Sequence, residues 1–407
     1  MAQLYETLTP ALALGLPLLA ASASADYSSW PELHDLLPAS FPGVKTSRDD
    51  FLVAIDRKTL EERLSAYFDP KVSHEEMARL FHSVMEGNSG YDPVATRTTL
   101  LKRGRKADAV VRYAYRPFDV RWLYREPETK LLDRNRAESW PHTFEGNVWL
   151  EAREKQAKEA FSRGTIVRHL ADNFGSGLSS FFPMRMAQGD TKVPNISKSA
   201  GVYLKANRAE TDDLFHHVVA ILHCPQYRHE NHDALRMGWP RIPLPKGSET
   251  LIASAKLGQT LVALLDPESP VPGVTAGAVR PELKLIAKPS RVGGGNLAGD
   301  DFALTAGWGH AQGGGIVMPA RGKTVGRNYT EQELAELKGG EEKLGLSSSD
   351  LLSLVGMTTF DIYLNGSAYW SNVPAAVCGL HLGRVSGPQE VAQLSRTRPA
   401  QKAALPG

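Results

Sequence analysis

The feature that most constrains the fold is the stretch from Tyr113 to Arg136, YAYRPFDVRWLYREPETKLLDRNR. Residues 109–124 alternate β-branched or aromatic side chains with other residue types, which is the pattern of β-strands. Pro117 lies inside this pattern and cannot donate to a strand ladder. The sequence therefore predicts two strands that are separated at Pro117.

The R-P-F-D-x-R-W motif at residues 116–122 lies at that break. An arginine and an aspartate this close together can form an ion pair that fixes a bend between strands. We expect this scaffold role for the motif, with Phe118 and Trp122 packed in the core.

Positive charge is concentrated around the same stretch. Between Arg97 and Arg136 there are twelve Lys/Arg and five Asp/Glu, an excess of seven, whereas the whole chain carries +2, so the remainder carries −5. Cations beside aromatic rings suit a polyanion with planar bases, that is, a nucleic acid. The alternative is a solvated strand face on which arginine stems lie over aromatic rings.

Periodicity along the chain predicts an α+β fold, with a helical middle flanked by strand-rich pieces. We expect four segments: a Pro/Ala-rich lead-in at 1–45, a first α+β part at 46–245, a second, Gly-rich part at 246–383, and a disordered tail at 384–407. Helices are predicted at 59–68, 73–86, 151–162, 212–223, from 225, at 250–266 and at 330–344; strands are predicted at 109–124, at 165–182 and within 272–330.

Composition excludes several classes of protein. With 42% apolar residues the chain can build a normal core, and its two cysteines cannot form a disulfide framework. The apolar run at 9–25 lacks a basic start and contains two prolines, so we expect a linker and neither a signal peptide nor a membrane span. Reduced thiols make the cytoplasm the expected location.

The motifs that resemble catalytic sites fail on spacing. Arg321-Gly322-Lys323-Thr324 lacks the glycine that a P-loop requires five residues before Gly322. The glycine-rich run at 292–301 has no strand-then-helix context. His223, Cys224, His229 and His232 are crowded, but Pro225 separates the pairs. We expect no catalytic residues, no metal and no cofactor.

Several longer segments together resemble one family. They are FPGVKTSRDDF (41–51), YRPFDVRWLY (115–124), LLDRNR (131–136), DNFGSGLSSFFP (172–183), YRHENHDALRMGWPRIPLP (227–245) and TFDIYLNGSAYWSNVPAAV (359–377). In this order they resemble the C-terminal specificity, or target-recognition, region of type ISP restriction–modification enzymes. Those enzymes are large polypeptides that join a nuclease, an ATP-driven translocase, an adenine methyltransferase and a target-recognition domain.

The resemblance implies a phage-defence protein that recognises double-stranded DNA and has no catalysis of its own. It would present a target adenine to an upstream methyltransferase or translocase domain or chain. Three alternatives stay open: an adenine methyltransferase or restriction subunit with an unrecognised active site, a non-functional truncated remnant, and a sugar- or peptide-binding module.

Two basic, glycine-containing loops are the candidates for DNA contact. One is LKRGRKAD at 101–108 and the other is PARGKTVGR at 319–327, each with cations around bare backbone. The candidate DNA-binding residues are Lys102, Arg103, Arg105, Lys106, Arg321, Lys323 and Arg327. The resemblance also implies a closing helix where this chain reads GPQEVAQLSR (387–396), so we expect residues from about Arg384 to be an out-of-frame tail.

Overall fold

A computed structural model describes residues 23–386, except 155–163, 174–178, 275, 279–285, 299–300, 302–308, 313–314, 320–322, 345–346, 376–380 and 383–384. The chain forms two compact units, Met1–Val44 with Arg136–Asp266 and Lys45–Asn135 with Pro267–Gly407. Each unit is discontinuous in sequence, whereas the predicted segments are continuous. Of the predicted segments, residues 1–22 of the lead-in and 387–407 of the tail lie outside the described residues.

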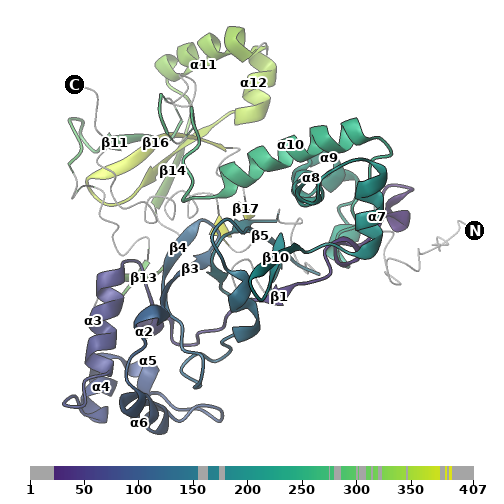
Figure 1. The fold of residues 1–407 in the computed structure, drawn as a ribbon. Helices are drawn as coiled ribbons and strands as arrows, with labels where there is room; N and C mark the ends of the chain where they lie inside the picture. Colours follow the sequence, from purple (N-terminus) through teal and green to yellow (C-terminus); the bar gives the residue numbers. More distant parts are fainter. Residues whose placement is uncertain are drawn as a thin grey trace, which may run out of the picture. The chain divides into compact units, whose positions relative to one another are not determined.

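The helices of the first unit are short near its N-terminus and longer in its second half. They are η2 (Tyr27–Ser29), α1 (Leu33–Leu36), η4 (Ala137–His142), α7 (Lys198–Ala206), α8 (Thr211–His223), α9 (Pro225–Glu230), η5 (Ala234–Arg236) and α10 (Ser248–Leu265). The predicted helices at 212–223, from Pro225 and at 250–266 are confirmed. Helices α8 and α10 lie side by side (Figure 1). Gly258 allows this approach, since a Cβ there would lie 1.8 Å from the carbonyl oxygen of His216.

The sheet of the first unit has the strand order β1-β8-β5-β6. Its strands are β1 (Phe41–Pro42), β5 (Trp149–Ala152), β6 (Ile166–Val167) and β8 (Ser180–Pro183); β7 (Leu170–Ala171) follows β6, and β9 (Arg185–Gln188) with β10 (Thr191–Pro194) forms a separate hairpin. The predicted strands within 165–182 are confirmed. The predicted helix at 151–162 is wrong at its start, because Glu151 belongs to β5, and 155–163 lie outside the described residues.

One hydrophobic core joins the helices and the sheet of the first unit. It contains Leu150, Ile166 and Phe182 from the sheet together with Leu214, Phe215, Val218, Leu222, Leu251 and Val262 from α8 and α10. The apolar stripe that predicted α8 from sequence is therefore the face that packs inward.

The first segment of the second unit packs short helices near an antiparallel hairpin. Its elements are α2 (Asp49–Leu52), β2 (Val53–Ala54), α3 (Arg57–Tyr67), α4 (His74–Leu80), α5 (His82–Met85), α6 (Pro93–Arg103), η3 (Ala107–Ala109), β3 (Val110–Arg116) and β4 (Asp119–Tyr124). Strand β4 lies between β2 and β3. The predicted single helix at 73–86 is two helices that meet at Phe81, and Ser73 caps the first by accepting from the amide of Glu76.

The R-P-F-D-x-R-W motif forms the turn of the β3–β4 hairpin, and the two predicted strands are confirmed. The guanidinium of Arg121 donates to both carboxylate oxygens of Asp119 at 2.8–3.1 Å, and both side chains are buried. The expected core positions of Phe118 and Trp122 are wrong, because both are half-buried. Phe118 sits at the turn with φ of 60°, which keeps it from joining the strand pattern. The residues that the hairpin buries fully are Tyr113, Tyr115, Leu123 and Tyr124.

The second segment of this unit contains a sheet with the order β11-β16-β15-β14. Its strands are β11 (Lys288–Arg291), β14 (Lys323–Arg327), β15 (Thr359–Tyr363) and β16 (Ala368–Pro374); two further hairpins are β12 (Gly309–Gln312) with β13 (Gly315–Pro319), and β17 (His381–Leu382) with β18 (Val385–Ser386). Helices α11 (Glu331–Leu344) and α12 (Ser348–Val355) complete it. The helix predicted at 330–344 is confirmed, with Thr330 and Glu333 forming a capping box.

The observed architecture is mixed α+β, with a helical run from α7 to α10 between strand-rich regions, as predicted. Among the described residues, no helix combines the length and apolarity needed to cross a bilayer.

Candidate nucleic-acid interface

The first predicted DNA-contacting loop is the end of α6 and the turn that follows it. Helix α6 ends at Arg103, and the amide of Gly104 donates to the carbonyl of Leu100 at 2.9 Å. Gly104 has φ of 82°, a conformation that glycine adopts without strain, and it directs the chain through η3 into β3. The local sequence therefore builds a turn with four closely spaced cations.

Three of these four cations have carboxylate partners within the protein. Arg103 donates to both oxygens of Glu126, at 2.9 and 2.5 Å, and to Glu128 at 3.1 Å. Glu126 is fully buried, and its hydrogen bonds raise the pKa of the Arg103 guanidinium above its usual value. Lys106 also donates to Glu128, and these two cations lower the pKa of the Glu128 carboxyl.

The other two cations, Lys102 and Arg105, are held less strongly by carboxylates. Arg105 lies 3.6 Å from Glu61 in a partly exposed pair, which contributes little to stability in water. Lys102 is exposed and forms no ion pair within the described part of the chain. Lys102 is therefore exposed to solvent, and Arg105 and Lys106 are partly exposed. Arg103 is held in place by its carboxylate partners.

The second predicted loop leads into β14. Arg321 lies outside the described residues. Lys323 is exposed, with its ammonium 4.8 Å from the centre of the Tyr363 ring.

Arg327 lies at the far end of β14 and bridges two carboxylates. Its guanidinium donates to Asp361 of β15 at 2.9 and 3.0 Å and to Glu333 of α11 at 2.7 and 2.8 Å. These bonds raise the pKa of Arg327, and the arginine lowers the pKa of the Glu333 carboxyl. The local role of Arg327 is to join a helix to the sheet.

The tyrosine rings of the arginine-rich hairpin are not available for base stacking. Tyr113, Tyr115 and Tyr124 are fully buried. The guanidinium groups of Arg116 and Arg121 lie 4.0 and 4.1 Å from the centre of the Tyr115 ring. This arrangement matches the alternative interpretation of the sequence pattern, in which arginine stems lie over aromatic rings.

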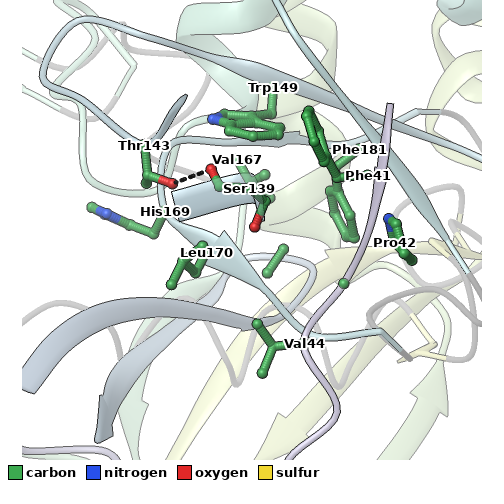
Figure 2. A pocket seen from close by; sticks show the side chains of 12 residues that line it. Phe41, Pro42, Val44, Ser139, Thr143, Trp149, Val167, His169, Leu170 and Phe181 are labelled. Atoms are coloured by element: carbon green, nitrogen blue, oxygen red, sulfur yellow. Dashed lines mark hydrogen bonds between the residues drawn. The ribbon is translucent and has the colours of Figure 1, made fainter. Parts of the chain in front are cut away.

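The first unit contains a hollow lined by aromatic rings (Figure 2). The rings of Phe41, Trp149 and Phe181 face it, and Thr143 lines it with its hydroxyl directed to the carbonyl of Ser139. The indole N–H of Trp149 is buried and has no hydrogen-bond partner among the described residues. Ser139, Thr143 and His169 also line the hollow, and the unpartnered indole donor beside it suits a bound water.

The segments 41–51 and 172–183, which carry part of the family resemblance, meet beside this hollow. The amide of Val44 donates to Ala171, and the amide of Asn173 donates to Val44, each at 2.8 Å. A Cβ on Gly43 would lie 2.4 Å from the backbone nitrogen of Asn173. The glycine of FPGV is therefore required by close backbone approach, which is a structural role.

The histidines that were crowded in sequence do not converge on a metal site. His223 bonds to the carbonyl of Gly164 at 2.8 Å, and His232 contacts Asp233 at 3.0 Å. No group of three or more potential ligands occurs in the described ranges.

Sequence analysis missed the β9–β10 hairpin. Residues 188–192, Gln-Gly-Asp-Thr-Lys, are exposed at its tip. The Gly-Asp pair between two short alternating runs was the available indication, because a two-residue loop that begins with glycine is typical of a tight hairpin.

Comparison with known proteins gives a family and a fold. The sequence model of the family described as "Type ISP C-terminal specificity domain" matches residues 35–387. No curated protein matches the sequence.

The solved structures that resemble the chain include three DNA complexes. A cryo-electron microscopy structure of a DrdV–DNA complex has a TM-score of 0.55 at 19% identity, over 90% of this chain and 32% of that one. A nuclease-deletion mutant of the Type ISP enzyme LlaGI with a DNA substrate mimic has a TM-score of 0.51 at 15% identity, over 89% and 29%. The ATP-dependent Type ISP enzyme LlaBIII bound to DNA has a TM-score of 0.55 at 16% identity, over 90% and 21%. The chain thus spans a third or less of each of these proteins.

Proposed function

The chain belongs to the Type ISP C-terminal specificity domain family, and from that premise we propose that it is the DNA-recognition module of a restriction–modification system. In this role it binds a specific duplex sequence and positions a target adenine for a methyltransferase domain on a neighbouring part of the polypeptide or on a separate chain. The location we propose with this function is the cytoplasm. The observation that carries the proposal is the family match over residues 35–387.

The charges of the second unit support a phosphate-binding role. We assign direct phosphate contacts to Lys102, Arg105, Lys106, Arg321 and Lys323. Lys102 and Lys323 are exposed, and cations that contact phosphates position a protein on the duplex without reading its sequence.

Arg103 and Arg327 belong to the same two loops and have a different part in binding. Each is held by two carboxylates: Arg103 fixes the turn that follows α6, and Arg327 joins β14 to Glu333 of α11 and Asp361 of β15.

The test is binding of the 407-residue chain to fluorescent duplex DNA at increasing salt. The five phosphate contacts of the second unit alone predict that log K falls with log salt with a slope of about −4.5, a loss of at least roughly 500-fold between about 50 and 200 mM. Affinity that does not respond to salt, or no binding, would contradict the proposal and would favour a sugar- or peptide-binding module.

A further inference from the structure

Resting on this proposed function, we propose that the β9–β10 hairpin is a base-reading ribbon that enters the major groove, with Gln188 and Asp190 at the base edges and Lys192 on a phosphate. A two-stranded ribbon has the width that the major groove accepts. The hairpin lies in the first unit, so this site is separate in sequence from the cationic loops.

The hairpin projects from a base at which the two ends of its chain segment are hydrogen-bonded to each other. Strand β8 ends at Pro183, and the amide of Asn195 donates back to the carbonyl of Met184 at 3.0 Å. The chain therefore returns to its starting point after residues 185–194, and the connection from β8 to α7 does not need the hairpin. A two-stranded ribbon is marginally stable alone, so its retention requires support from the rest of the unit.

That support comes from two buried asparagines at the base of the hairpin. The side-chain amide of Asn147 donates to the carbonyl of Arg185 at 2.9 Å, and its oxygen accepts from the amide of Arg185 at 3.1 Å. Asn195 donates to the carbonyls of Ala39 and Pro183 at 2.8 and 2.9 Å. Asn147 and Asn195 are 1% and 3% exposed, so these bonds form away from water and hold the root of the hairpin firmly.

A histidine fixes the middle of the first strand. The amide of Ala187 donates to Nδ1 of His142 at 3.1 Å. Burial lowers the pKa of His142, so its ring stays neutral and Nδ1 remains an acceptor at physiological pH. The exposed tip is thus carried by a rigid stem, which is what a side chain needs in order to discriminate between bases.

The register of the hairpin divides its polar side chains between two faces. Gln188 pairs with Thr191, and Ala187 pairs with Lys192, so Gln188 and Lys192 point to opposite faces. The ammonium of Lys192 lies 4.3 Å from the centre of the Phe144 ring, on the body side. Gln188 and the turn residue Asp190 are left facing solvent.

These side chains have the chemistry of base readers. A glutamine amide matches the N6 and N7 atoms of adenine, and an aspartate accepts from N4 of cytosine. A lysine set back from the tip suits the phosphate backbone. We infer that the hairpin contributes sequence discrimination, whereas the loops of the second unit contribute general affinity.

The experiment selects preferred sequences from a random duplex pool with the wild-type chain, and then with Q188A, D190A and K192A. Q188A and D190A should each lose preference at particular positions, on the order of ten-fold or more per position, with an unchanged salt slope. K192A should keep the preference and reduce the salt slope by about 0.9. The matched control is K256A/Q259A on the exposed face of α10, which should change neither. Thermal melting checks that every variant is folded.

The possible outcomes separate this inference from the proposed function. If the wild type selects a sequence and all three hairpin variants select the same one with the same slope, the hairpin does not read DNA and the proposed function stands. Salt-dependent binding without any selected sequence also overturns the inference. Absence of salt-dependent binding by the wild type overturns both.

Discussion

Replacing Arg103 with methionine separates the structural role of this arginine from a role in DNA contact. The substitution keeps most of the apolar stem and removes the charge. It leaves Glu126, a fully buried carboxylate, without its cation.

The cost follows from what remains around Glu126. Removing one partner of a buried ion pair typically costs about 3–5 kcal/mol. Here one oxygen of Glu126 still accepts from the amides of Glu128 and Thr129, at 2.8 and 3.2 Å, and Arg103 is itself 21% exposed. Both facts reduce the penalty, so we expect a loss of about 2 kcal/mol in the free energy of unfolding.

Urea unfolding followed by circular dichroism measures this loss, and an unchanged m-value shows that the unfolded states are comparable. The control is Lys102→Met one position earlier, which should change stability by less than about 0.5 kcal/mol because Lys102 is exposed. In folded protein, Lys102→Met should lower the salt slope of DNA binding by about 0.9, and Arg103→Met should leave it unchanged. A loss below about 0.5 kcal/mol for Arg103→Met, together with a reduced slope, would refute the positioning role.

Three further predictions concern other parts of the molecule. Gly258→Ala should destabilise the first unit by about 2–3 kcal/mol in thermal melts, because the new Cβ would lie 1.8 Å from the His216 oxygen; a neutral result would mean that α8 and α10 separate easily. Arg327 lowers the pKa of Glu333 below its ordinary 4.5, so this stabilisation is present above pH 4.5 and is lost as the pH falls through the folded pKa. Arg327→Met should therefore be less stable at neutral pH, with the gap closing below pH 4.5 in urea titrations; a gap that does not vary with pH would argue against this linkage. Finally, the isolated chain should transfer no methyl group from S-adenosylmethionine to DNA in a radiolabel assay, and robust turnover would contradict the recognition role.

Local sequence was sufficient for elements whose signals lie within one turn or one strand. The apolar periodicity of α8, the helix at 330–344 and the helix that begins at Pro225 each depend on residues a few positions apart, and each prediction is confirmed. The helix predicted at 73–86 is not continuous, because Phe81 has φ of −142° and interrupts it. Its ring packs against Phe51 at 5.3 Å, a contact from another element.

The candidate site was less predictable, because a charged side chain shows its type in the sequence and not its partner. The sequence shows four cations at 102–106. Only the fold shows that Arg103 pairs with Glu126 and Lys106 pairs with Glu128, each more than twenty residues later. The aromatic rings of the Tyr113–Arg136 stretch looked available for stacking, yet strand pairing turns the tyrosines inward.

The amino-acid sequence alone determined the class of fold, helices α3, α8, α9, α10 and α11, the two strands around Pro117 and the family resemblance, because periodicity, caps and ordered motifs are properties of neighbouring residues. Tertiary structure decided which cations remain exposed, which residues form the core of the β3–β4 hairpin, and that residues 185–194 form a rooted ribbon with a polar tip. The physical reason is that charge pairing, burial and the support of a hairpin depend on atoms that are distant in sequence and meet only in the folded chain.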